Sequence, residues 1–186
     1  GRIVLDVSPN EEGIHLSVTQ TDPADPVRNI RVIMPGFEQT YQQQVFHPEF
    51  LASIEPFSTI RFMDWMSTNN SQVSSWAERS SPESASYATG RGVPVEVMAD
   101  LCNRLGADAW FCIPHLADDD FVRRFAEAAM QHLDPGRRVY IEHSNEVWNG
   151  IFSQNSYAYQ QAAARGIPGD PYQSALRYHS ERSVER

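Results

Sequence analysis

The chain has 186 residues, and 24 acidic residues against 15 basic ones give it a formal net charge of -9. This length is enough for one domain with a sizeable core. The absence of a basic run argues against a nucleic-acid surface, and no apolar stretch approaches the roughly 18 residues of a membrane-spanning helix. We therefore expect neither nucleic acid nor a membrane among the partners. Two cysteines, Cys102 and Cys112, match neither a disulfide framework nor a zinc spacing, so they leave the compartment open.

The first thirty residues have a sequence pattern typical of β-strands. Residues 3–7 and 14–20 are predicted strands, and residues 21–26 form a proline-marked connector. We assign residues 1–29 to a β-strand segment, the end of an accessory β-domain. The strand-like start favours an excised or mature segment over a natural translation start. Residues 30–34 are predicted as the next strand, which Pro35 and Gly36 stop.

From about residue 46 the pattern alternates between strands and helices. A short helix begins at Pro48, and a long polar loop at 66–92, with a helical part around Trp76, is of a length often associated with function. Alternation of this kind is typical of a parallel sheet built from βαβ units. We expect strands near 58–63, 108–113 and 138–143 to be adjacent, parallel and in that order, with helices outside. Further helices are predicted at 93–105, after the three aspartates 118–120, at about 152–165 and from Pro171.

Residues 139–149, Val-Tyr-Ile-Glu-His-Ser-Asn-Glu-Val-Trp-Asn, organise the rest of the chain. The segment starts as a strand of β-forming residues and then becomes polar and acidic. In α/β proteins the polar groups at the carboxyl ends of parallel strands carry the chemistry. The alternative is a strand-to-loop turn in which Ser144 and Asn145 satisfy backbone groups and Glu146 is solvated.

Two other predicted strand ends add polar groups that would converge with this segment. Arg61 lies in the first strand, Asp64 and Trp65 follow it, and His115 follows the second strand. A carboxylic acid can serve as general acid or base, and asparagine can hold a sugar hydroxyl group. Tryptophan offers a flat apolar face for a sugar ring. The candidate substrate-binding residues are Asn145, Arg61, His115, Trp65, Trp148 and His143.

The Ser144-Asn145-Glu146 run at a strand end in a βα series resembles glycoside hydrolase clan A, whose members are (β/α)₈ barrels. This resemblance implies that Glu146 is the catalytic acid/base and that Asn145 contacts the substrate 2-hydroxyl group. Arg61 and His115 match an arginine and a histidine that are frequent in the clan, if residues 30–34 are strand one. The longer run 141–149 is also similar to one seen in large bacterial proteins with carbohydrate-related modules.

The resemblance implies an α/β fold, a partial (β/α)₈ (TIM) barrel of about four strand–helix units. Residues 30–186 would be its amino-terminal half. The implied function is retaining hydrolysis of a polysaccharide or oligosaccharide, with this chain supplying the acid/base half and no cofactor. A complete barrel takes about 250 residues, so the nucleophile would come from the missing carboxyl-terminal half, and the isolated chain should be inactive. An extracytoplasmic or secreted location is the expectation. The alternative is a non-catalytic carbohydrate-binding or structural module.

Each candidate also has a structural interpretation. Arg61 could form an ion pair with Asp64 or Glu142, while His115 and His143 could simply cap or fill the fold. A zinc site from His115, His143 and Glu146 matches no metal motif, so no metal is predicted. Trp110, in the middle of a predicted strand, is expected in the core.

Overall fold

The computed structural model describes residues 3–4 and 16–185. The chain divides into two compact units, Gly1–Val45 and Phe46–Arg186. The described residues of the first unit form turns and one isolated antiparallel bridge between Asp22 and Asp25, and no strand. The strand expected at 3–7 lies mostly outside the described residues, and so does part of the one at 14–20. The strand expected at 30–34 is absent, so that prediction was wrong.

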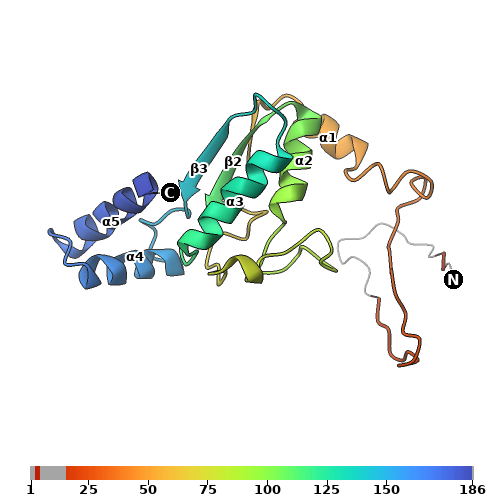
Figure 1. Cartoon of the computed structure of the whole chain (residues 1–186), viewed down its shortest axis with the longest axis horizontal. Coiled ribbons are helices and arrows are strands. Elements are labelled where there is room, and N and C mark those ends of the chain that lie inside the picture. Colours follow the sequence, from red (N-terminus) through yellow and green to blue (C-terminus); the bar gives the residue numbers. More distant parts are fainter. Residues whose placement is uncertain (1–2, 5–15, 186) are drawn as a thin grey trace. The chain divides into compact units, whose positions relative to one another are not determined.

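The second unit contains the regular structure (Figure 1). Local signals in the sequence set several boundaries. The Asp118 side chain accepts a hydrogen bond from Phe121 N at 2.7 Å and so caps a helix, and Gly106, at φ 67°, ends another. In chain order the elements are α1 (Pro48–Ile54), β1 (Thr59–Arg61), the 3₁₀ helix η1 (Trp76–Glu78), α2 (Val95–Leu105), β2 (Asp108–Ile113), α3 (Asp119–His132), β3 (Val139–His143), α4 (Ser153–Ala164) and α5 (Pro171–Glu185).

The three strands form one parallel sheet in the order β1-β2-β3. In its register Arg61 lies opposite Trp110, Trp110 opposite Tyr140, and Cys112 opposite Glu142. The predicted order and direction of the three strands are therefore confirmed. The helical turn expected around Trp76 is present as η1.

The predicted partial TIM barrel was wrong. The described residues form a small α/β domain with a three-stranded parallel sheet and five α-helices. The prediction failed at both ends of the series: residues 30–34 supply no first strand, and α5 follows α4 without a strand between them. Alternation along a sequence indicates βα units, but it does not say how many strands pair into the sheet.

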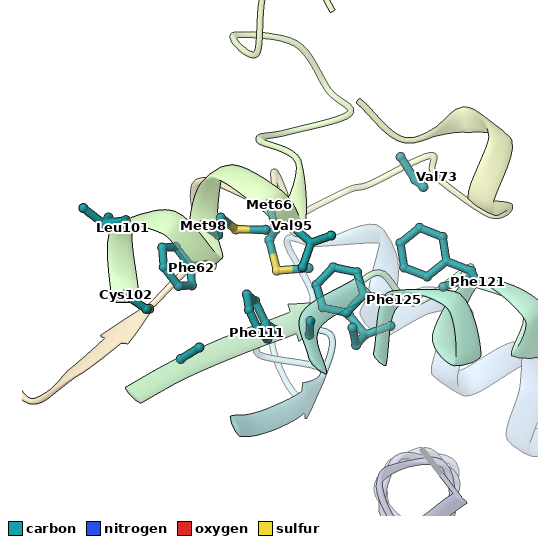
Figure 2. Packing of buried hydrophobic residues seen from close by; sticks show 14 of the residues in the cluster. Phe62, Met66, Val73, Val95, Met98, Leu101, Cys102, Phe111, Phe121 and Phe125 are labelled. Carbon is teal, nitrogen blue, oxygen red and sulfur yellow. The ribbon is translucent and has the colours of Figure 1, made fainter. Parts of the chain in front are cut away.

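One face of the sheet carries the core. Phe62 and Phe111 stack at 5.5 Å between ring centroids, and Phe111 meets Phe125 of α3 edge-on at 5.0 Å. Met98 and Leu101 of α2 complete this buried layer, as the close view in Figure 2 shows. Helices α2 and α3 thus cover one face of the sheet (Figure 1).

The opposite face of the sheet is open around Trp110 and Tyr140, although Cys112 on the same face is buried. Residues paired across a parallel ladder point to the same face, so Arg61, Trp110 and Tyr140 form one row, and Cys112 and Glu142 lie in the next. Trp110 is 37% exposed, and its predicted place in the core was wrong. The pattern of apolar residues did not reveal this, because the same strand buries Phe111 on its other side.

Helices α4 and α5 form a second small core. Val147, Ala158, Ala162, Ala175 and Tyr178 are its buried members. Its link to the sheet includes the imidazole rings of His143 in β3 and His179 in α5, which stack at 5.4 Å. In the described part of the chain, no helix combines the length and the apolar character that crossing a membrane requires.

Candidate active site

The candidate site begins where β3 ends. Ser144 N donates to the Ile113 carbonyl at 2.8 Å and so extends the ladder by one bond beyond the strand. The backbone then turns sharply, because Ser144 and Glu146 adopt φ values of 63° and 41°. A left-handed conformation costs a residue other than glycine about 1–2 kcal/mol. Two such residues flank Asn145, and strained backbone of this kind clusters at functional sites.

The Asn145 side chain is held at both ends of its amide. Its Oδ1 accepts from Arg61 Nη2 at 2.8 Å, and its Nδ2 donates to Asn69 Oδ1 at 2.9 Å. The residue is only 4% exposed. A primary amide has two donor hydrogens and two acceptor lone pairs. One donor hydrogen and one acceptor lone pair of the amide are therefore not used in these two bonds, and the amide has a fixed orientation.

Gln154, the second residue of α4, stabilises this turn through hydrogen bonds. Its Nε2 donates to the Asn145 carbonyl at 2.9 Å and to Asn69 Oδ1 at 2.7 Å. Its Oε1 accepts from Asn70 N at 3.1 Å, which ties the 66–92 loop to the same point. Sequence reasoning missed both Gln154 and Asn69. The one available signal was that the polar loop had been expected to be functional.

Glu142, which lies opposite Cys112 in the sheet, accepts several hydrogen bonds. Its carboxylate accepts from Arg61 Nε and Nη2, with a shortest distance of 2.8 Å, and from Trp110 Nε1 at 3.0 Å. The ion pair between Arg61 and Glu142, one of the two alternatives for Arg61, is therefore present. Arg61 also bonds Asn145, so the same guanidinium group links a structural pair to the candidate site.

The charges around Arg61 are mutually supporting. Burial disfavours the charged form of Arg61, but hydrogen bonding to Glu142 and the charges of Glu142 and Glu146 outweigh it, so the pKa of Arg61 is raised. Burial and the Glu142 carboxylate raise the pKa of the Cys112 thiol to about 12. Cys112 is therefore a protonated donor, placed 3.3 Å from Glu142 Oε2, and not a thiolate nucleophile.

Glu146 is partly exposed beside this cluster. Asn149 Nδ2 donates to its Oε2 at 2.9 Å, which orients the carboxyl group and leaves Oε1 open to a ligand or water. The charge of Glu146 is also one of the smaller causes that raise the pKa of Arg61. Trp148, two residues on, is 59% exposed.

The other predicted site residues lie in different surroundings. The His115 ring is buried against the edge of the Tyr157 ring at 5.2 Å, and burial lowers the pKa of His115, which favours its neutral form. His143 stacks on His179, with 3.3 Å between their Nδ1 atoms. Trp65 stacks on aromatic rings of the core, including Phe46 at 6.4 Å. The structure thus brings Arg61 and Asn145 into contact, and it gives these three residues other neighbours.

A metal has no ready place among the described residues, where no group of three or more His, Cys, Asp or Glu side chains is arranged to hold one. The histidines considered for zinc, His115 and His143, each pack against a different aromatic partner. The side chains that are hydrogen-bonded to Asn145 are two amides and a guanidinium group.

Comparison with known proteins assigns no family to this chain. No protein-family model matches the chain, no curated protein matches it, and no solved structure matches it.

Proposed function

We propose that the chain binds a polysaccharide or oligosaccharide at the carboxyl ends of β1–β3, and that Glu146 acts there as the acid/base in hydrolysis of a glycosidic bond. The observation that carries this proposal is the fixing of Asn145. Arg61 and Asn69 orient its amide, and two left-handed residues hold it directly before a carboxyl group. Such rigid placement suits a group that must recognise one hydroxyl of a sugar next to the bond that breaks.

In this proposal Glu146 first gives its proton to the leaving glycosidic oxygen and then takes one from the attacking water. In most glycosidase families the mechanism needs a second carboxyl group, about 5–5.5 Å away for retention and about 6.5–9.5 Å away for inversion. The nearest acidic residue along the strand, Glu142, is occupied by Arg61 and Trp110. We therefore place the retaining nucleophile on another polypeptide segment, and we expect little or no turnover from the 186 residues alone.

The commitment of Glu142 to its ion pair also favours a second candidate function. A carbohydrate-binding module needs the oriented amide and the half-exposed carboxyl group of this site, but no second carboxylate. The two functions share a ligand and differ in whether a glycosidic bond is broken.

Binding is tested first, by affinity electrophoresis and calorimetry of the chain against a panel of soluble neutral polysaccharides. We expect binding by the wild type, a loss of about tenfold or more in affinity for Asn145→Ala, and retained binding for Glu146→Gln. Gln160→Ala, an exposed change on α4, is the matched control. Because Asn145 is buried, the unfolding curve of each variant shows whether a loss of binding is a loss of fold. Unchanged affinity in a folded Asn145→Ala variant would contradict the proposed site.

Hydrolysis is tested by release of reducing ends. Where a second carboxylate is present, Glu146→Gln should lower the rate about 10²–10⁴-fold on natural polysaccharide, and less on substrates with activated leaving groups. Glu181→Gln, an exposed change on α5, is the control. Turnover by the 186 residues that disappears with Glu146→Gln would place the second carboxylate within this chain. Turnover that survives that substitution would remove the acid/base role of Glu146.

A further inference from the structure

The open face of the sheet presents two aromatic side chains next to the candidate site. Trp110 and Tyr140 lie on adjacent strands in the same row, 37% and 41% exposed, with ring centroids 6.1 Å apart. Their rings are inclined by 41°, so they form a shallow surface rather than a closed stack. Exposed apolar groups gathered in this way mark binding surfaces more often than scattered ones do.

Polar neighbours hold this aromatic surface in place. The indole N–H of Trp110 donates to Glu142 Oε2 at 3.0 Å, so the ring cannot turn about its bonds without losing a charge-assisted hydrogen bond. The Arg61 guanidinium carbon lies 5.4 Å from the centre of the Trp110 ring. Since the indole N–H is already satisfied, the exposed part of the ring is free to serve as an apolar contact.

The surface is continuous with the candidate site. An unbroken series of hydrogen bonds runs from Trp110 through Glu142 and Arg61 to Asn145. A ligand seated on Asn145 could therefore extend down the sheet onto the rings. Because Arg61 and Glu142 form an ion pair, this path favours an uncharged ligand that carries many hydroxyl groups.

The size of the face argues against a protein partner. Three strands about 4.8 Å apart, with three, six and five residues of about 3.3 Å each, define an area on the order of 200 Å². A standard protein–protein interface needs about 800 Å² from each side. A short oligosaccharide, by contrast, is a narrow chain of rings whose C–H faces are apolar and whose edges carry hydroxyl groups.

We propose that Trp110 and Tyr140 form a stacking platform for a neutral oligosaccharide, continuing the Asn145 site along the open sheet face. This inference rests on the proposed function and names residues for it that the Asn-Glu motif does not include. The rings would contact sugar faces, while Arg61 and Glu142, already fixed, would offer their remaining polar atoms to hydroxyl groups.

The experiment measures the affinity of the chain for soluble oligosaccharides, from disaccharide to hexasaccharide, of whichever polysaccharide it binds. Affinity for wild type should rise with length until the platform is filled. Trp110→Ala should lower affinity for the longer sugars by about tenfold and leave the disaccharide little changed, as expected for the loss of one aromatic contact. Trp110→Phe, which keeps a ring but loses the indole N–H, should stay within about threefold of wild type. Tyr140→Ala should resemble Trp110→Ala, and Tyr172→Ala, an exposed aromatic of α5, is the control.

The outcomes separate this inference from the proposed function. If folded Trp110→Ala and Tyr140→Ala bind every length as wild type does, while Asn145→Ala binds weakly, the platform is refuted and the site remains. If the aromatic variants bind weakly and Asn145→Ala does not, the platform stands and the proposed site fails. A wild-type chain that binds no saccharide refutes both. Reversible dimerisation in sedimentation that disappears in Trp110→Ala would show a second copy on this face, which also overturns the platform.

Discussion

Replacing Gln154 by methionine should destabilise the protein far more than its place on a helix surface pattern would indicate. Gln154 is 1% exposed and makes three hydrogen bonds, to the Asn145 carbonyl, Asn69 Oδ1 and Asn70 N. Methionine has a similar length and a similar helix propensity, so the substitution mainly removes polar atoms. The buried Asn145 carbonyl would lose this donor at about 1–3 kcal/mol, and the two partly buried bonds would add about 0.5–1.5 kcal/mol each.

The expected loss in the free energy of unfolding is therefore about 2–6 kcal/mol. Urea denaturation followed by circular dichroism measures it, with the slope compared between variants to exclude a change in the unfolded state. Gln160→Met, on the exposed side of α4, should change stability by less than about 0.5 kcal/mol. A loss below about 1 kcal/mol for Gln154→Met would refute the reasoning, since it would mean that water replaces these bonds at little cost.

Three further predictions concern single features of the fold. Gly92→Ala should destabilise the protein by roughly 1–3 kcal/mol more than Gly166→Ala. Both glycines have positive φ, but only at Gly92 would the added Cβ lie 2.5 Å from a backbone oxygen. The urea midpoints of the two variants test this, and equal losses of stability would contradict it. Asp118→Ala should cost about 1 kcal/mol in the same assay through loss of the α3 cap; an unchanged midpoint would show that the cap is replaced. Burial lowers the pKa of His115 and of His179, so the unfolded chain binds protons at higher pH than the folded chain does. The free energy of unfolding should therefore fall as the pH drops below about 6.5. Replacing both residues with glutamine should flatten that pH dependence.

The strands could be predicted because each has a local cause. Most of the second half of β2 and the first three residues of β3 are β-forming, and the helix signals Gly106 and Asp118 lie on either side of β2. The number of paired strands had no such cause. Residues 30–34 have the composition of a strand, but pairing depends on a partner at the right place, and they belong to the unit Gly1–Val45.

The candidate site divides in the same way. Arg61 and Asn145 could be predicted because both lie at or near the ends of parallel strands. The ion pair between Glu142 and Arg61 depends on the register of the sheet. Arg61 lies in the same row as Tyr140, and Glu142 is two residues beyond Tyr140 in β3. Gln154 and Asn69 were not predicted, because an amide that is fixed by hydrogen bonds has the same composition as a solvated one. Gln154 is buried because α4 begins directly behind the turn and its side chain bonds the Asn145 carbonyl.

At the two left-handed residues around Asn145, Ser144 and Glu146, glycine would favour stability, but at Glu146 it would remove the proposed reacting group. Glycine adopts φ values of 63° and 41° without steric cost, so Ser144→Gly and Glu146→Gly should relieve strain. In a library selected only for heat resistance, glycine should become frequent at both positions. In a library selected for action on a polysaccharide where a second carboxylate is present, glycine could still be accepted at 144 but should vanish at 146. The difference in residue frequencies between the two selections would locate the reacting group from population data alone.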